Sequence, residues 1–233
     1  MTLRAASALV FDCDGTLVDS EAIHADALWH VLREVGVHVE PHVFQDRFIG
    51  VDNPTIVEWV TATLKAELPA DFDARVERHT HGAVSEKVRA IAGASAVIHS
   101  FSEAHVPLAV ASNSSLRTVE AMLRGVGLMS YFEGRIASRD KVQFPKPAPD
   151  IYRLAARMLA VAPETCLAVE DSVPGIRSAR AAGMSVIGFS PGGNPADLVE
   201  AGAELVVCQL ADLLNLDLKF STTATLTDPI GRS

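Results

Sequence analysis

The chain has few cysteines, no long apolar run and no excess of positive charge. Each absence argues against a class of protein. The three cysteines, Cys13, Cys166 and Cys208, show no CxxC spacing, which favours a reduced, cytoplasmic setting. No apolar run approaches the ~18 residues of a membrane helix, and acids interrupt the apolar start, which argues against a signal peptide. The net charge of −9 argues against binding to nucleic acid or anionic membranes. We therefore expect a soluble cytoplasmic protein.

Short apolar runs dominate what is present, and they are typical of buried parallel strands. Helix signals separate the later runs. Ser172 is placed to cap a helix that runs through Ala182, with Gly183 just past its end, and Asn194–Pro195 begins another that Gly202 closes. This alternation predicts a Rossmann-like, doubly wound parallel α/β sheet. The five expected strands cover residues 8–11, 107–112, 166–170, 185–189 and 204–207.

The segment 19–91 has a different pattern, with no convincing strand. Its first part, 21–36, carries apolar residues at intervals of four and ends at Gly36, Asn53–Pro54 begins a second helix, and a third is expected over 72–91. We therefore predict an all-helical cap domain at 19–91, inserted into an α/β core domain made of 1–18 and 92–233.

Polar side chains follow three of the expected strands, at the point where each strand ends. Because parallel strands end at the same edge of a sheet, and ligands bind beyond that edge, these side chains should converge there. A lysine between two prolines, just before a helix, joins them. The candidates are Asp12 and Asp14, Ser112 and Asn113, Glu170 and Asp171, and Lys146.

Several carboxylates in one place require a cation, because like charges repel and are costly to desolvate. Oxygen ligands without histidine or cysteine favour Mg²⁺. Mg²⁺, a lysine and helix-start N–H groups together make a phosphate site. One carboxylate can then attack phosphorus, and a second, two residues on, can act as acid and base.

Four motifs occur in order along essentially the whole chain: "DCDGTLVDSE", "ASN", "KPAPDIY" and "VEDSVPGI". Together they resemble the haloacid dehalogenase-like (HAD) phosphatases that carry a helical cap after the first strand, a group that includes β-phosphoglucomutase and sugar phosphatases. The resemblance implies Asp12 as nucleophile and Asp14 as general acid/base. Relatives that act on halides or phosphonates differ at the second position, so Asp14 favours phosphate esters.

The same resemblance implies the remaining roles. Ser112, the Asn113 backbone N–H and Lys146 would hold phosphate. Lys146 would also pair with Asp12 and is counted among the catalytic residues. The Mg²⁺ ligands implied are Asp12, the Asp14 carbonyl, Glu170 and Asp171.

Four residues near the first motif have ordinary structural interpretations. We expect Asp19 and Ser20 to cap the first helix of the segment, and Glu21 to be a favourable charge in its first turn. His24 has two interpretations that the sequence leaves open. It either approaches Asp14, as a histidine does at this spacing in β-phosphoglucomutase, or it packs against its neighbours.

Two further pairs have structural and functional interpretations. Ser114 and Ser115 either touch substrate or begin the helix "LRTVEAML", and helix capping is favoured for Ser115. His79 and His81 form an HxH pair without other ligands nearby in sequence, so a solvated helix face is expected.

The function predicted is a Mg²⁺-dependent phosphatase that forms an aspartyl-phosphate. Its partner would be a small phosphorylated metabolite, such as a sugar phosphate or a sugar-acid phosphate like 6-phosphogluconate, and the protein would be a monomer or weak homo-oligomer. A non-catalytic binding protein on the same scaffold is disfavoured because the motifs retain their acids and lysine.

A phosphosugar mutase of the β-phosphoglucomutase type is the main alternative. In that enzyme a lysine and an arginine of the cap bind the second phosphate. The stretch "FIGVDN", which follows Arg47 and ends at Asn53, has Ile49 and Asn53 at those places. Hydrolysis is therefore favoured, unless Arg47 substitutes.

Overall fold

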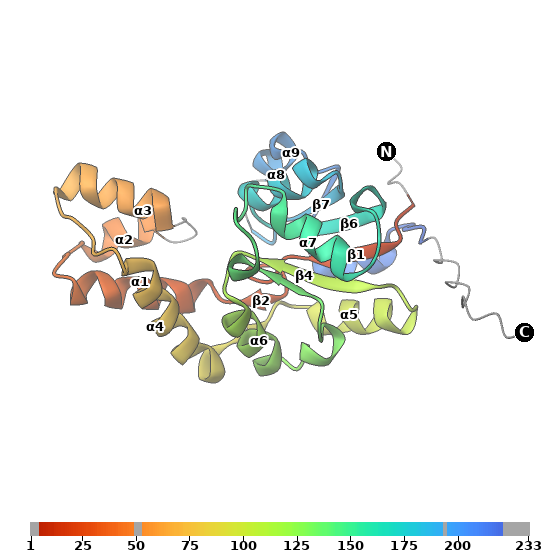
Figure 1. Cartoon of the computed structure of the whole chain (residues 1–233), viewed down its shortest axis with the longest axis horizontal. Helices are drawn as coiled ribbons and strands as arrows, with labels where there is room; N and C mark the ends of the chain where they lie inside the picture. The colour runs from red at the N-terminus through yellow and green to blue at the C-terminus, as the bar shows by residue number, and fades with distance from the viewer. Residues whose placement is uncertain (1–4, 49–52, 193–194, 221–233) are drawn as a thin grey trace, which may run out of the picture.

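The computed structural model describes residues 5–48, 53–192 and 195–220. A six-stranded parallel sheet lies between two layers of helices, and a group of four helices lies to one side of it (Figure 1). None of the helices in the described ranges is long and apolar enough to cross a membrane. The strands are β1 Ala8–Phe11, β2 Val18–Asp19, β3 Arg89–Ala90, β4 Leu108–Ser112, β5 Ile136–Ser138, β6 Cys166–Glu170, β7 Ser185–Phe189 and β8 Leu205–Val207. The helices are α1 Glu21–Glu34, α2 Pro41–Phe48, α3 Asn53–Trp59, α4 Phe72–Lys87, α5 Ala94–Glu103, α6 Leu116–Gly125, α7 Asp150–Met158, α8 Val173–Ala182 and α9 Pro195–Ala201.

The order of the large sheet is β5-β4-β1-β6-β7-β8, and all of its neighbouring strands are parallel. From β1 the chain builds outward through β4 and β5, then returns to the other side of β1 with β6. Ligands bind at such a reversal of strand order. The predicted doubly wound fold and its five strands are confirmed. The three-residue β5 was not predicted, because it is too short to give a pattern.

Alternation along β1 distributes its side chains over two cores. Leu9 and Phe11 pack on the face covered by α5 and α6, while Ala8 and Val10 pack on the face covered by α7, α8 and α9. The second face is rich in alanine, on strands and helices alike, so these helices lie close to the sheet. This packing holds the carboxyl end of β1 between those of β4 and β6.

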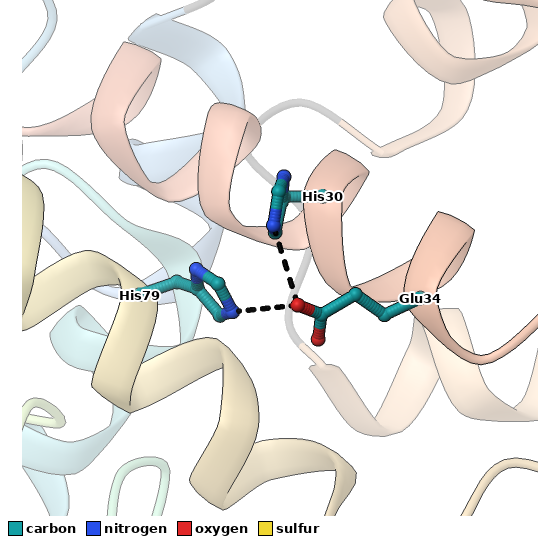
Figure 2. Close-up of side chains that lie close together, drawn as sticks. All are labelled: His30, Glu34 and His79. Carbon is teal, nitrogen blue, oxygen red and sulfur yellow. Dashed lines mark ion pairs between the residues drawn. The ribbon is translucent and has the colours of Figure 1, made fainter.

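The four helices α1–α4 enclose a core of their own, which includes Val31, Ile56 and Val60. Helix α3 continues into a short π-helical turn, Val60–Leu64. The sequence did not predict α2, whose eight residues show little apolar periodicity. Where α1 and α4 pack together, His30, Glu34 and His79 meet on the outside of the group (Figure 2).

A two-stranded antiparallel ribbon lies where the chain enters and leaves this helical group. Val18 of β2 pairs with Ala90 of β3, and Asp19 pairs with Arg89. The expectation of no strand within 19–91 is therefore wrong at its edges, and the third helix ends at Lys87 rather than 91. Strands of two residues leave no periodic signal. The boundaries assigned to a core and a cap domain stay a prediction.

Candidate active site

The turn after β1 brings two acids to the edge of the sheet. The backbone N–H groups of Leu17 and Val18 both donate to the Cys13 carbonyl, which closes the loop that carries Asp14. Gly15 lies in the left-handed region, at φ +81°, and a Cβ there would collide with the Asp171 carboxylate. Glycine is thus required both by the turn and by the approach of an acid from the neighbouring strand.

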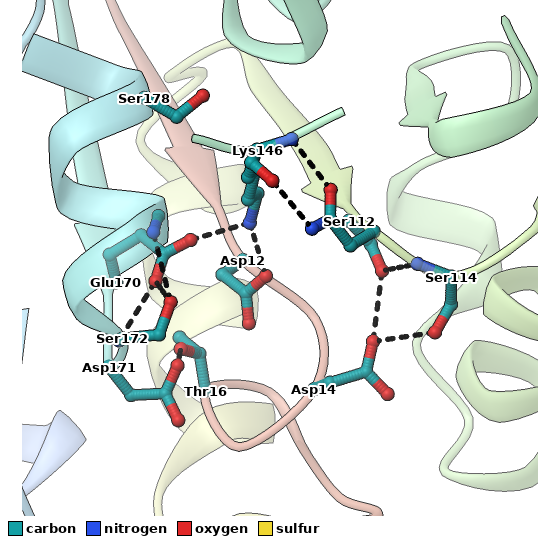
Figure 3. A network of polar contacts seen from close by, with 12 residues as sticks. Asp12, Asp14, Thr16, Ser112, Ser114, Lys146, Glu170, Asp171, Ser172 and Ser178 are labelled. Carbon is teal, nitrogen blue, oxygen red and sulfur yellow. Dashed lines mark hydrogen bonds and ion pairs between the residues drawn. The ribbon is translucent and has the colours of Figure 1, made fainter. Parts of the chain in front are cut away.

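The Asp12 carboxylate is buried, and its two oxygens lie in different surroundings. Its Oδ1 accepts from Lys146 Nζ at 2.6 Å, and the same ammonium donates to Glu170 Oε1 at 2.5 Å (Figure 3). Its Oδ2 is buried and has no hydrogen-bond partner among the described residues. A buried oxygen left in this state is costly unless a ligand or ion completes it.

Glu170 is held from several sides and is 0% exposed. Its Oε1 also accepts from the Tyr152 hydroxyl at 3.0 Å, while its Oε2 accepts from the Ser172 backbone N–H and hydroxyl at 3.0 and 2.9 Å. Gly175 leaves room for it, because a Cβ there would collide with the carboxylate. Glu170 therefore positions the lysine, which in turn contacts Asp12.

Negative charge is in excess on this side of the site. Asp12, Glu170 and Asp171 offer oxygens that lie within 4.8 Å of one another, and Lys146 is the cation in contact with Asp12 and Glu170. Burial, opposed by Lys146 and reinforced by the other acids, raises the pKa of Asp12 well above its usual value. Burial and the charge of Glu170 raise the pKa of Asp171 to about 7. One ammonium does not neutralise three carboxylates, so the donor set fits a hard divalent cation such as Mg²⁺.

The Asp14 carboxylate lies on the other side, where donors are in excess. Its Oδ2 accepts from the hydroxyls of Ser112 and Ser114 at 2.9 and 3.1 Å, and its Oδ1 accepts from that of Ser20 at 2.8 Å. His24 Nε2 lies 2.9 Å from the same Oδ1.

These contacts move two pKa values in opposite directions. Burial would raise the pKa of Asp14, but the hydrogen bond and charge of His24, with the bonds from Ser20 and Ser112, lower it below its usual range. Burial would lower the pKa of His24, but its hydrogen bond to Asp14 and the charges of Asp14 and Glu77 raise it. The pair thus favours a carboxylate next to an imidazolium.

The loop after β4 is tied to the lysine segment. The Asn113 side chain donates to the Lys146 carbonyl at 3.2 Å and accepts from the Lys146 backbone N–H at 2.9 Å. These two bonds align the lysine with the end of β4, where the Ser112 hydroxyl and the start of α6 also lie.

The structure brings together the seven residues predicted to form the site, Asp12, Asp14, Ser112, Asn113, Lys146, Glu170 and Asp171. His24, whose role the sequence left open, contacts Asp14. The side chains of Arg47 and Asn53, and the whole of Ile49, lie outside the described residues.

Two of the sequence-based expectations are wrong. Ser20 occupies the N-cap position of α1, but its side chain makes no capping bond. Its hydroxyl donates to Asp14 instead. His79 is not on a purely solvated face, because it meets His30 and Glu34 of α1. Ser115 does cap α6, accepting from the Thr118 N–H.

Sequence reasoning missed three contributions. It gave no role to the Asn113 amide, the Tyr152 hydroxyl or Ser172 beyond helix capping. Tyr152 ends the motif "KPAPDIY", so its place six residues after the lysine was the one available signal. The amide and serine contacts depend on loops that meet only in the folded chain.

Comparison with known proteins agrees with this geometry. The family model described as haloacid dehalogenase-like hydrolase matches residues 9–189. The chain is 33% identical over 187 residues to 6-phosphogluconate phosphatase of Escherichia coli, covering 78% of this chain and 81% of that one. It is 33% identical over 190 residues to the fructose-1-phosphate phosphatase YqaB of the same organism, covering 77% and 94%.

A solved structure shows the same fold. CbbY from Rhodobacter sphaeroides, crystallised in complex with xylulose-(1,5)bisphosphate, superposes with a TM-score of 0.76 at 30% identity, covering 91% of this chain and all of that one. The protein belongs to the haloacid dehalogenase-like hydrolases, as its motifs predicted. Its enzyme class is that of the phosphoric monoester hydrolases.

Proposed function

We propose that this protein is a Mg²⁺-dependent phosphatase that hydrolyses a sugar phosphate or sugar-acid phosphate through an aspartyl-phosphate. The observation that carries the proposal is the Asp12 carboxylate, with one oxygen held by Lys146 and the other buried and unpartnered at the end of β1. The relatives named for 6-phosphogluconate and fructose 1-phosphate support the substrate class.

In the first step, Oδ2 of Asp12 attacks phosphorus and the ester P–O bond breaks. The Ser112 hydroxyl and the Asn113 backbone N–H bind phosphoryl oxygens, and Lys146 offsets the charge that develops on them. The leaving alkoxide takes a proton from the Asp14–His24 pair. The hydrogen bond and the charge of Asp14 raise the pKa of His24, which favours keeping that proton beside the carboxylate.

In the second step, water loses a proton to Asp14 and attacks phosphorus, which frees Asp12 and releases inorganic phosphate. The donors around Asp14 favour its ionised form, which is the form that accepts this proton. The Asp14–His24 pair thus gives one proton to the leaving group and regains one from water, which restores it for the next cycle.

Asp12, Glu170 and Asp171, with the Asp14 carbonyl, are the residues proposed to hold Mg²⁺. When bound, the ion supplies positive charge that favours approach of a phosphoryl group to carboxylates. Because both oxygens of Glu170 already accept bonds from the protein, we assign it chiefly to positioning Lys146.

Phosphorus NMR tests the proposal directly. Purified protein with Mg²⁺ is incubated with a panel that includes 6-phosphogluconate, fructose 1-phosphate and glucose 6-phosphate, with Asp12→Asn as matched control. We expect inorganic phosphate from at least one ester, and none above background from the variant. An unreacted panel with Mg²⁺, or equal rates for both proteins, contradicts the proposal.

The same experiment distinguishes a phosphatase from a mutase. A second sample contains β-glucose 1-phosphate with a trace of glucose 1,6-bisphosphate. The phosphatase leaves the 1-phosphate unconverted or releases phosphate from it. Conversion to the 6-phosphate without free phosphate identifies a mutase.

A further inference from the structure

Two helices of the helical group present a second cluster of potential metal ligands, separate from the catalytic acids. His30 and Glu34 are one turn apart on α1, and His79 faces them from α4 (Figure 2). His30 Nε2 lies 3.3 Å from Glu34 Oε1, and His79 Nε2 lies 3.4 Å from the same oxygen. Two imidazoles therefore converge on one carboxylate oxygen.

The spacing suits an ion better than it suits two ion pairs. The ring centroids of His30 and His79 are 4.5 Å apart, so two imidazolium charges would repel each other over a single carboxylate. The three ligand atoms lie within 4.8 Å of one another. Atoms bound about 2.0–2.1 Å from a tetrahedral ion are about 3.3 Å apart, close to the two nitrogen–oxygen separations here.

The cluster is open to solvent and lies beside a hollow. The side chains of His30, Glu34 and His79 are 61%, 40% and 36% exposed. The hollow has a volume of about 300 Å³ and is lined by Asp26, Ala27, Trp29, His30, His79 and Ala83. An ion can thus enter without unfolding the group, and water has room to complete its coordination.

We propose that His30, Glu34 and His79 form a binding site for a borderline divalent ion of the Zn²⁺ class. Two imidazole nitrogens and one carboxylate oxygen suit Zn²⁺, Co²⁺, Ni²⁺ or Cu²⁺, whereas Mg²⁺ and Ca²⁺ require oxygen ligands. The ion cross-links α1 to α4. Both helices also reach the catalytic acid, because α1 carries His24 and the residue after His79 is Thr80, whose Oγ1 lies 3.5 Å from His24 Nδ1.

Zn²⁺ titration by calorimetry tests the site, using tag-free protein kept in excess Mg²⁺. We expect one equivalent of Zn²⁺ with micromolar Kd, and a thermal unfolding midpoint raised by about 5 °C at saturation. His30→Gln, Glu34→Gln and His79→Gln should each weaken binding at least tenfold. His99→Gln, which changes another exposed histidine on α5, is the matched control and should bind like the parent protein.

Cu²⁺ electron paramagnetic resonance separates this site from the all-oxygen catalytic acids. Coupling to two imidazole nitrogens, lost in His79→Gln and retained in His99→Gln, supports the proposal. Signals from oxygen ligands alone, or Zn²⁺ affinity that His30→Gln and His79→Gln leave unchanged, overturn it. The variants alter exposed or half-buried side chains, and circular dichroism of the metal-free proteins verifies that they are folded.

Discussion

Asp12 and Asp14 are separated by one residue, yet they lie in opposite electrostatic surroundings. Asp12 belongs to the side built from β1 and β6, where three acids lie close together and Lys146 contacts two of them, Asp12 and Glu170. Asp14 belongs to the side where hydroxyls and an imidazole converge, two of them supplied by Ser20 and His24 at the start of the helical group. The first side has an excess of negative charge and so favours binding of a cation, which in turn favours approach of a phosphoryl group. The second has surplus donors and so retains a proton.

The nucleophile is the residue on which this contrast depends most. Asp12→Asn should lower Mg²⁺-dependent turnover by roughly 10⁴-fold or more, because an amide does not form the covalent intermediate. The fold should persist, since removing one carboxylate relieves repulsion with Glu170 and Asp171. Phosphate release and thermal unfolding measure the two effects. Near-parental turnover would disprove the mechanism.

Removing the lysine should damage both activity and stability. Lys146 is 4% exposed at its side chain, so Lys146→Met leaves the buried carboxylates of Asp12 and Glu170 without a counter-charge, at a cost of about 3–5 kcal/mol. The loss should be larger at pH 8 than at pH 5, because the acids escape repulsion by protonation as pH falls. Urea unfolding at both pH values measures it. An equal loss at both would show that packing, not charge, dominates.

On the Asp14 side, His24→Gln should lower kcat by about tenfold, less than the 10²–10⁴-fold typical of losing an acid–base group itself. In the parent protein NMR should place the His24 pKa above its ordinary value, and Asp14→Asn should lower it. A raised folded pKa stabilises the protein below the unfolded value near pH 6.5, and this contribution disappears as pH rises through the folded pKa. A stability difference between His24→Gln and parent that grows with pH would contradict the pairing.

The Mg²⁺ affinity should depend on pH because of the excess of carboxylates on the Asp12 side. Because the pKa of metal-free Asp171 is raised to about 7, protons compete with Mg²⁺ below that pH. Apparent Mg²⁺ affinity should therefore rise roughly tenfold between pH 6 and pH 8. Calorimetry at several pH values measures this slope. Asp171→Asn is the control, and it should bind weakly with a flatter profile.

The smallest effect is expected where the helical group contacts the core. Glu77 of α4 accepts from the hydroxyls of Ser115, the N-cap of α6, and Thr118 within α6, both at 2.5 Å. Glu77→Gln should change KM by a few-fold and stability by about 1 kcal/mol, because these bonds are neutral-to-charged and partly solvated. Steady-state kinetics measures it, with Glu120→Gln as control, because the Glu120 carboxylate pairs with Arg124 within α6. A larger change in kcat than in KM would assign Glu77 to the chemistry itself.

The local sequence pattern was sufficient to predict a site residue wherever that residue directly follows a strand. The apolar runs that end at Asp12, Ser112 and Glu170 predicted both the strands and the edge at which their polar neighbours meet. The local sequence pattern gave the wrong contacts where tertiary contacts compete with local ones. Ser20 has a capping position but donates to Asp14 instead, and His79 meets a glutamate that lies 45 positions earlier in the chain.

The short ribbon of β2 and β3 has a consequence for how such a molecule can diversify. Because Val18 lies beside Ala90, the helical group starts and finishes at one point on the sheet edge. A different segment with equally close ends could take its place without stretching the chain on either side. Such an exchange would leave the nucleophile and its lysine where they are while replacing His24 and its neighbours. The contact between Lys146 and Asp12 therefore lies outside the helical group, whereas the contact between His24 and Asp14 depends on it.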